Sequence, residues 1–306
     1  MAMRVSNQLD SINEIFDEIR IGHDKELMKS YNPIEKHFDV VDSSNEGYQD
    51  YTSLSGITDV PALGAGPVTE TNMYQLYDTR IDYKEYAVSV PIEHALIRFA
   101  KYDAVKNIIN ELTYAAYKRK VTQAENIFIN GHSATKTSTT GGGTGDGVAL
   151  FSASHPSTVP SIAVRSNTGT SSLDATAVAA TRLLGYKTKD ANGQFMGNHY
   201  DTLVVGVNKA DDAYTIANTP KQTGGGNNDL SANYGLNVEV LRYGNPGNKW
   251  YMYNSQTVKK DLKYVMFEQP RILKDMKIDL MLFYTTLYMN INPSWIGFES
   301  IYGHNV

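Results

Sequence analysis

The alternation of apolar and polar positions is clearest in residues 73–90, MYQLYDTRIDYKEYAVSV. Two sets of side chains alternate along this segment: Tyr77, Thr79, Ile81 and Tyr83 on one face, and Asp78, Arg80, Asp82 and Lys84 on the other. This period of two predicts an extended strand. An unbroken strand of this length would extend roughly 60 Å at ~3.3 Å per residue. Since most strands are shorter, we expect it to bend round a core or to leave it.

A β-hairpin is the expected context of this strand. The preceding segment VPALGAGP, from Val60 to Pro67, has the glycine and proline content of a turn. Residues 48–59 are a weaker strand candidate on the other side of that turn. Opposite charges on the polar face would suit pairing between the two strands. A long projecting hairpin is therefore expected, and an ordinary edge of a meander remains open as the alternative.

Helical periodicity marks two segments in the first half of the chain. In residues 8–29, apolar residues recur at three- and four-residue spacing: Leu9, Ile12, Phe16 and Ile19. Nothing in the first 45 residues offers this helix a partner, so we expect it to pack on another part of the chain or on another subunit. Residues 103–130 predict a helix of roughly 40 Å that Asp103 caps and Gly131 ends.

The second half of the chain predicts a mixed unit followed by long strands. Asp174 is expected to cap a helix that runs to Tyr186. The remaining expected elements are a turn at 189–194, a strand at 202–208, a helix at 209–218, strands at 236–244 and 249–254, and long β segments at 277–291 and 295–303. The predicted fold class is α+β, with the mixed unit inserted between the early long helix and the late strands.

The composition of the chain narrows the classes of protein to which it can belong. The chain has 306 residues, a formal net charge of −5 and no cysteine. The absence of cysteine excludes a disulfide framework and a thiolate metal site, and the mild acidity gives no general attraction to nucleic acid or membranes. The polar, acidic N-terminus lacks the apolar region of a signal peptide. The most apolar late segment carries Lys277 and Asp279 and is too short to span a bilayer.

One stretch carries the residue types of an active site. GTGDGVALFSASHP, from Gly143 to Pro156, combines Asp146, two serines and His155 behind a glycine run. It contains no G-x-S-x-G turn. Ser154 and His155 are adjacent, so in extended chain their side chains point to opposite faces. We therefore expect these groups to lack convergent partners, and replacement of Asp146 and His155 to leave folding and assembly nearly intact.

Other candidate chemistry is equally weak. The glycine run lacks the G-K-[ST] of a phosphate loop, and the seven histidines have no metal-ligand spacing. Asp211 and Asp212 fall at a predicted helix start, where the helix dipole favours carboxylates. The run Lys118–Lys120 is interpreted as a solvated helix face rather than a nucleic-acid contact. No cofactor and no metal are expected.

The order of these motifs resembles that of the major capsid proteins of tailed bacteriophages, which have the Hong Kong 97-type fold. The likeness is strongest to the Mu-like major head subunit branch. A long helix ends at FINGHS, a glycine-rich loop leads into DGVALFSASHP (Asp146 to Pro156), and the segments DANGQ, TLVVGVN and KWYMYN follow in order. Each motif is loose, but their order and spacing are specific.

The resemblance implies four parts of the chain. These are an N-terminal arm at 1–45, an extended β-hairpin loop at 46–90, a peripheral domain at 91–165 and 265–306 with a spine helix at 103–130, and an axial domain at 166–264. It implies a structural protein rather than an enzyme, which self-assembles into hexamers and pentamers of an icosahedral virion capsid around double-stranded DNA. Assembly would take place in the cytoplasm of the host bacterium, and the N-terminal helix would find its partner across a subunit boundary.

The resemblance also implies partners. These are further copies of the chain, separate scaffold, portal and decoration proteins, and packaged DNA touched non-specifically on the inner face, with no membrane. Candidate inter-subunit contacts are Leu9, Ile12, Phe16, Ile19, Val60, Pro61, Pro67, Tyr77, Asp78, Arg80, Asp82, Lys84, Gln222, Asn227 and Asn228, the last three in a loop expected at the capsomer centre. The alternatives are an encapsulin-type compartment shell, a β-rich phage tail or decoration protein, and a hydrolase that uses Asp146 and His155.

Overall fold

The fold is described from a computed structural model of the chain. It describes residues 18–44, 46–57, 62, 68, 70, 73–93, 102–136, 138, 141–159, 162–218, 235–277 and 282–306. The helices are α2 Pro33–His37, α4 Tyr102–Ile129, α5 Ala175–Lys187, α6 Ala210–Asn218 and α8 Val258–Asp261, with a 3₁₀ turn η1 at Val207–Lys209. The strands are β1 Asp39–Asp42, β2 Tyr48–Leu54, β3 Gln75–Asp82, β4 Glu85–Glu93, β5 Thr168–Gly169, β6 Thr202–Gly206, β7 Asn237–Leu241, β8 Trp250–Tyr253, β9 Leu262–Lys277, β10 Leu282–Trp295 and β11 Ile301–His304.

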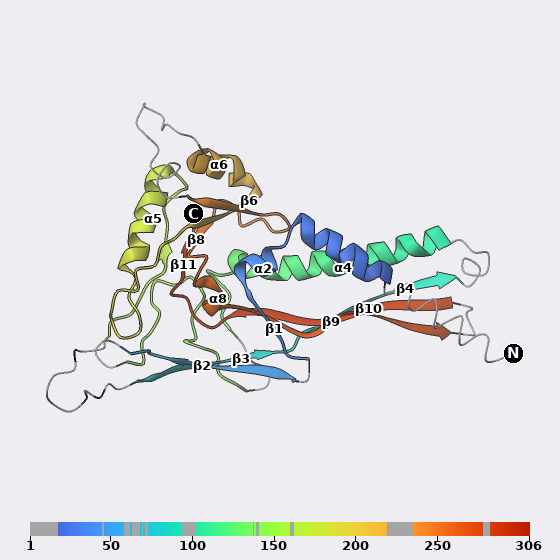
Figure 1. Cartoon of the computed structure of the whole chain (residues 1–306), viewed down its shortest axis with the longest axis horizontal. Helices are drawn as coiled ribbons and strands as arrows, with labels where there is room; N and C mark the ends of the chain where they lie inside the picture. The colour runs from blue at the N-terminus through green and yellow to red at the C-terminus, as the bar shows by residue number, and fades with distance from the viewer. Residues whose placement is uncertain are drawn as a thin grey trace.

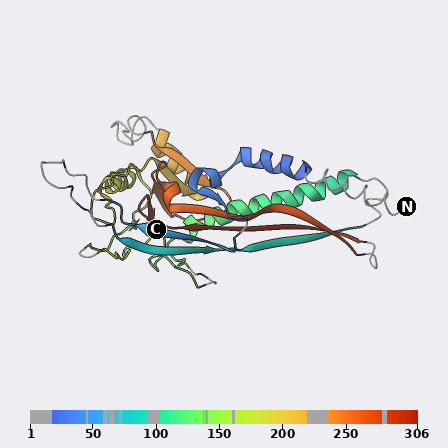
Figure 2. The same cartoon turned by 60° about the horizontal axis from the view of Figure 1, so that its bottom comes forward.

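The first sheet has the order β1-β9-β10-β4, and the long antiparallel pair β9–β10 forms its centre. The predicted helix at 103–130 is confirmed as α4, whose apolar stripe packs on this sheet. Phe128 is fully buried against Tyr251 and Phe38. Figure 2 shows the layers: α4 lies on one side of β9 and β10, and the strands β2 and β3 lie on the other.

The second sheet has the order β5-β11-β8-β6-β7 and carries α5 and α6. Asp174 caps α5 as predicted, since its Oδ1 accepts from the Ala177 N–H at 2.7 Å. Every residue of β6 is buried, as expected for an apolar run. The last strand differs from the expectation. We predicted a strand at 295–303 within the peripheral domain, but β11 pairs with β8 and β5 in the second sheet.

The strand predicted over residues 73–90 is interrupted. β3 and β4 belong to different sheets, and Tyr83 and Lys84 separate them. At this point the backbone is held to β10 instead: the Lys84 N–H donates to Asn290 Oδ1 at 2.9 Å, and the Ile291 N–H donates to Lys84 O at 3.1 Å. The single predicted strand therefore serves two sheets, with its change of direction fixed by hydrogen bonds from β10.

Strand β9 was not predicted at its observed position. The sequence analysis placed the late strand at 277–291, whereas β9 runs over 262–277 and β10 over 282–295. Charged residues are spaced along β9 on both faces and hide its period of two. Pairing on both sides, with β1 and with β10, supplies the hydrogen bonds that hold it extended.

The described part of the N-terminal helix, residues 18–30, packs on α4 of its own chain. Lys120 Nζ lies 2.9 Å from Asp24 Oδ1, and Ile19 packs, partly buried, against Val105 and Ile109. For these turns the helix has its partner within the chain, not across a subunit boundary. The run Lys118–Lys120 is accordingly not one solvated face, because Lys120 is buried in this ion pair.

Candidate functional site

The hairpin formed by β2 and β3 is a separate two-stranded sheet, which confirms the predicted hairpin. Asp50 and Arg80 are opposite each other in the register, and their side chains form a two-point ion pair with both N···O distances at 2.6 Å. The Arg80 guanidinium also lies 3.8 Å from the centre of the Tyr48 ring. The charges on the polar face therefore pair across the strands, as the sequence predicted.

Figure 1 shows that one end of the hairpin lies far from the first sheet, and several of the described residues toward this end are apolar and exposed. Among the described residues of this end, Leu54 is 56% exposed, Ile57 63%, Val68 76% and Met73 50%. Single exposed apolar residues are ordinary, but several on one projecting hairpin are typical of a protein–protein contact.

The glycine-rich loop pairs with the middle of β3. The Arg80 N–H donates to Gly143 O at 2.7 Å, and the Gly145 N–H donates to Asp78 O at 2.9 Å. Thr144 thus pairs with Thr79 in an antiparallel bridge, so the loop acts as a third, very short strand beside β3. A Cβ on Gly143 would lie 2.1 Å from Asp78 O. Glycine is therefore required for the backbone of the loop to approach β3 this closely.

Asp146 and His155 meet directly behind this loop. His155 Nδ1 lies 2.5 Å from Asp146 Oδ2, and His155 Nε2 lies 3.0 Å from Asn167 Oδ1. The Asn167 Nδ2 donates to Leu150 O at 2.8 Å, so its Oδ1 is an acceptor and Nε2 of the ring must donate. The ring is 1% exposed and stacks on Phe298, with centroids 3.5 Å apart.

This arrangement corrects the sequence analysis on one point and supports it on another. The expectation that Asp146 and His155 lack convergent partners is wrong, because they bind each other and Asn167. Both ring nitrogens are occupied and Ser154 is exposed, so among the described residues that contact the His155 ring nitrogens none is a hydroxyl. The expectation that replacement of Asp146 and His155 leaves folding and assembly nearly intact depended on this lack of partners, and the buried contacts favour a loss of stability instead.

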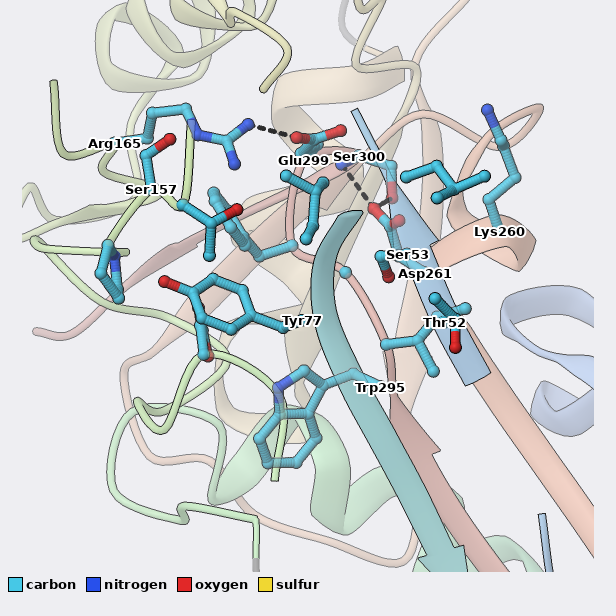
Figure 3. A pocket seen from close by; sticks show the side chains of 18 of the residues that line it. Thr52, Ser53, Tyr77, Ser157, Arg165, Lys260, Asp261, Trp295, Glu299 and Ser300 are labelled. Carbon is cyan, nitrogen blue, oxygen red and sulfur yellow. Dashed lines mark hydrogen bonds and ion pairs between the residues drawn. The ribbon is translucent and has the colours of Figure 1, made fainter. Parts of the chain in front are cut away.

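A cavity of about 300 Å³ lies between the hairpin and the rest of the molecule (Figure 3). Thr52 and Tyr77 line it from the hairpin, and Trp295 lines it from the end of β10. Burial raises the pKa of Asp261 to about 6, although Ser300 donates to its carboxylate through both N–H and hydroxyl. Burial lowers the pKa of Lys136 to about 8.

No metal centre or membrane span is found in the part of the chain that the structure describes. Within it, no three His, Asp or Glu side chains come close enough together to hold a metal ion. Its helices also lack the length and apolar character needed to cross a bilayer.

Six of the predicted contact residues lie in the described part of the chain. Ile19 packs within its own chain, Arg80 is paired with Asp50, and Asp82 is buried and accepts from the Ser138 hydroxyl at 3.0 Å. Tyr77 lines the cavity, while Asp78 and Lys84 are exposed. The others lie outside the described residues: Leu9, Ile12, Phe16, Val60, Pro61, Pro67, Gln222, Asn227 and Asn228. The inter-subunit role of all of them stays a prediction.

One buried carboxylate was missed by the sequence analysis. Glu125 of α4 accepts from Tyr31 Oη at 2.8 Å and from the N–H groups of Arg242 and Tyr243, each at 2.9 Å. Burial raises its pKa. It thus ties α4 to the loop after β7 in the second sheet. The sequence did contain a signal for this buried position. Glu125 lies three residues before Phe128, on the same apolar stripe of α4.

Comparisons with known proteins agree with this architecture. A family model described as phage capsid protein matches residues 76–277, and no curated protein matches the chain in sequence. Among solved structures, a virus-like particle from Pyrococcus furiosus has a TM-score of 0.54 at 11% identity, covering 95% of this chain and 100% of that one. Microbacterium phage Oxtober96 has a TM-score of 0.55 at 10% identity, covering 88% and 89%. The procapsid of bacteriophage JBD30 has a TM-score of 0.52 at 10% identity, covering 97% and 75%.

At these identities the solved structures show the fold, and the family model shows the family. The Hong Kong 97-type fold and the major capsid function expected from the sequence are confirmed. The encapsulin-type alternative has less support, because the matching model is that of phage capsids. The placement in the Mu-like branch stays a prediction. Since the match extends over most of the chain, this chain belongs to the phage capsid protein family.

Proposed function

We propose that the chain is the repeating subunit of a phage head, assembled as hexamers and pentamers around double-stranded DNA in the cytoplasm of the host. In this proposal the β2–β3 hairpin lies over a neighbouring copy. The role is structural, and neither Asp146 nor His155 performs catalysis. Scaffold, portal and decoration proteins are separate chains.

The exposed apolar end of the hairpin is the observation that carries this proposal. A two-stranded hairpin is marginally stable by itself, yet this one leaves Leu54, Ile57 and Met73 at least half exposed. Burial of apolar surface stabilises a contact by about 25 cal/mol per Å². A neighbouring copy that covers this end would remove the exposed area from water, so the hairpin favours assembly.

The weak net charge fits a shell around DNA. At −5 over 306 residues, the chain has no overall attraction for a polyanion. Contact with packaged DNA is therefore proposed to be local and non-specific, which leaves DNA able to slide during packaging and release.

Replacement of one residue at the hairpin end tests the proposal. The full chain is purified and its assembly followed by light scattering and negative-stain microscopy at rising concentration. Wild type is expected to form rings or shells, and Ile57→Asp to shift the concentration needed at least tenfold upward. Val306→Asp, which places the same charge at an exposed position in the C-terminal segment, is the matched control. A wild-type chain that stays monomeric throughout would refute the proposed function. Equal assembly by wild type and Ile57→Asp would refute the role of the hairpin.

A further inference from the structure

We propose that a cavity beside the C-terminal end of α5 is a binding site for an organic anion with an apolar body, such as a carboxylate carried on an aromatic ring. This inference goes beyond the proposed function, because the wall of the cavity comes from one copy of the chain. The cavity, which we call the α5 cavity, has a volume of about 300 Å³. Three parts of the chain line it: residues 165–167, residues 184–189 with Tyr200, and residues 298–302.

The α5 cavity shares one wall with the cavity between the hairpin and the rest of the molecule, the hairpin cavity. Arg165, Phe298 and Glu299 line both cavities. Figure 3 shows this wall from the side of the hairpin cavity, with Arg165 and Glu299 joined by their ion pair. The Arg165 guanidinium also donates to Lys189 O at 3.2 Å and lies 4.7 Å from the centre of the Phe298 ring. Several contacts thus hold the shared wall in place.

The two cavities differ in the balance of their charges. Among the described residues, the wall of the hairpin cavity contains three basic and three acidic side chains: Lys136, Arg165 and Lys260 with Asp146, Asp261 and Glu299. In the α5 cavity the charges of Arg165 and Glu299 cancel in their ion pair, and Lys187 and Lys189 are present in addition. Its wall therefore has an excess of two positive charges, which favours an anion.

The two lysines are available for a ligand. Both are exposed, and within the described ranges of the chain neither forms an ion pair with a carboxylate. Lys189 Nζ lies 5.2 Å from the centre of the Phe195 ring. A lysine ammonium is carried on a flexible stem and has three donors, so it can turn toward an anion that enters the cavity.

The end of α5 does not cancel this positive charge. The last carbonyl groups of a helix carry partial negative charge, which would oppose a bound anion. Here Thr188 covers two of them, since its N–H donates to Gly185 O at 3.1 Å and its hydroxyl donates to Leu184 O at 3.2 Å. The partial charge at the helix end is thus compensated within the chain.

The rest of the wall requires an apolar body on the ligand. Tyr200 is buried, and the partly buried rings of Phe298 and Tyr302 line the cavity together with Leu184. A small inorganic ion would leave these side chains in contact with water, whereas an apolar body would cover them. A volume of about 300 Å³ is at the small end of the range of ligand pockets, which fits one ring and one acidic group.

The Tyr200 hydroxyl is a further donor in this wall. It lies 3.5 Å from Thr188 Oγ1, at the limit of a hydrogen bond. Because the Thr188 hydroxyl donates its own proton to Leu184 O, Tyr200 is the donor in this weak contact. Burial raises the pKa of Tyr200 to about 12, so the phenol keeps its proton at neutral pH. A carboxylate in the cavity would give this proton a stronger acceptor.

Binding of phenylacetate to the full chain, at a concentration below that of assembly, tests the inference. Saturation-transfer NMR and the rise in unfolding temperature measure the affinity. Phenylacetate is expected to bind about tenfold more tightly than phenylacetamide, which lacks the charge, or acetate, which lacks the ring. Equal binding of the amide or of acetate would overturn the inference.

An acetylated tripeptide, Gly-Gly-Phe with a free C-terminal carboxylate, shows where the ligand comes from. It presents the same ring and acidic group at the end of a peptide chain. Binding of phenylacetate alone would support a free small molecule, and binding of the tripeptide would support the end of a protein chain. Binding of neither probe would overturn the inference.

Two adjacent leucines provide a matched pair of variants that locates the site. Leu184 lines the cavity and is 42% exposed, whereas Leu183 is 58% exposed and is not part of the wall. Leu184→Asp places a carboxylate in the wall and is expected to weaken phenylacetate binding about tenfold by repulsion. Leu183→Asp introduces the same charge on the same turn and should bind like wild type. Circular dichroism checks that both remain folded, and equal binding by the two folded variants would refute the location.

Replacement of the two lysines tests the source of the charge. Lys187→Gln with Lys189→Gln is expected to weaken binding about fivefold and to reduce its dependence on salt. Lys25→Gln with Lys29→Gln removes the same charge from exposed positions of the N-terminal helix and is the control. If both double variants bind phenylacetate like wild type, the inference fails. Because binding is measured on the unassembled chain, such a failure leaves the proposed function standing.

Discussion

At the scale of single residues, the pair formed by Asp146 and His155 shows how side chains typical of an active site can hold a loop in place. The imidazole is held on both nitrogens, by Asp146 and by Asn167, and its face is covered by Phe298. Asn167 in turn donates to the backbone of Leu150. This chain of contacts fixes the loop that binds the hairpin. The residues that had raised the hydrolase alternative thus make the contacts that hold the loop.

Removal of the carboxylate is expected to destabilise the subunit. In Asp146→Ala the buried ring keeps its hydrogen bond to Asn167, but its Nδ1 loses its partner, and a buried polar group left without a hydrogen bond costs about 1–3 kcal/mol. The exposed pair Arg271–Glu268 supplies the control, because Glu268→Ala removes a carboxylate from a surface ion pair and should cost less than about 1 kcal/mol. Urea unfolding of the dilute subunit measures both. Similar midpoints for the two variants would contradict the anchoring role.

At the scale of elements, the hairpin depends on a loop that has almost no side chains. The segment from Gly141 to Gly147 contains five glycines, and its backbone completes the edge of β3. Glycine is needed at Gly143 because of the contact with Asp78 O, and at Gly145 because φ is +68°. The glycine-rich composition of this segment is typical of a flexible linker. The pairing of Thr144 with Thr79 nevertheless gives the segment a defined structure.

A single methyl group should loosen this contact. In Gly143→Ala the new Cβ would overlap Asp78 O, so loop and strand must separate, at an expected cost of about 1–3 kcal/mol. Hydrogen exchange of residues 75–82 is expected to accelerate. Gly47→Ala is the control near the same hairpin, because a Cβ added there would meet no described atom within 4 Å and the φ of Gly47 is not positive. Unchanged exchange in Gly143→Ala would show that the loop does not hold the hairpin.

At the scale of the whole molecule, the C-terminal strand completes the second sheet. β11 lies between β5 and β8 in the second sheet, although β10, directly before it, is at the centre of the first. Ile301 is fully buried, and His304 stacks on Trp250 with centroids 3.9 Å apart. The last residues therefore complete the second unit, while Glu125 joins that unit to α4.

A chain that ends at Ser300 is expected to lose the second unit. Without β11, β5 and β8 have no common neighbour and Trp250 loses the ring that covers it. We expect a fall in thermal unfolding temperature of more than about 10 °C or loss of soluble protein, given that several kcal/mol of buried contact disappear. Removal of Val306 alone, which is exposed, should change little. Calorimetry of both shortened chains tests this prediction. Equal unfolding temperatures for the two chains would show that β11 is dispensable.

Much of the fold could be predicted from local pattern. The helices α4 and α5 appeared from their apolar period and caps, and β2 and β3 from alternation around a glycine- and proline-rich turn. Such signals depend on neighbours within a few residues, so the sequence by itself determined them. The sequence of motifs also identified the family, because order and spacing along the chain survive where each motif is loose.

Only the tertiary structure decided which distant groups meet. The interruption between β3 and β4 depends on Asn290 of another strand, the assignment of β11 to the second sheet depends on β8, and the meeting of Asp146 with His155 depends on Asn167 and Phe298. None of these contacts leaves a periodic signal, because hydrogen bonds and ring contacts form between residues whose separation along the chain is arbitrary. The sequence thus determined the helices α4 and α5, the hairpin and the family, and packing determined where the other strands lie and which polar side chains meet.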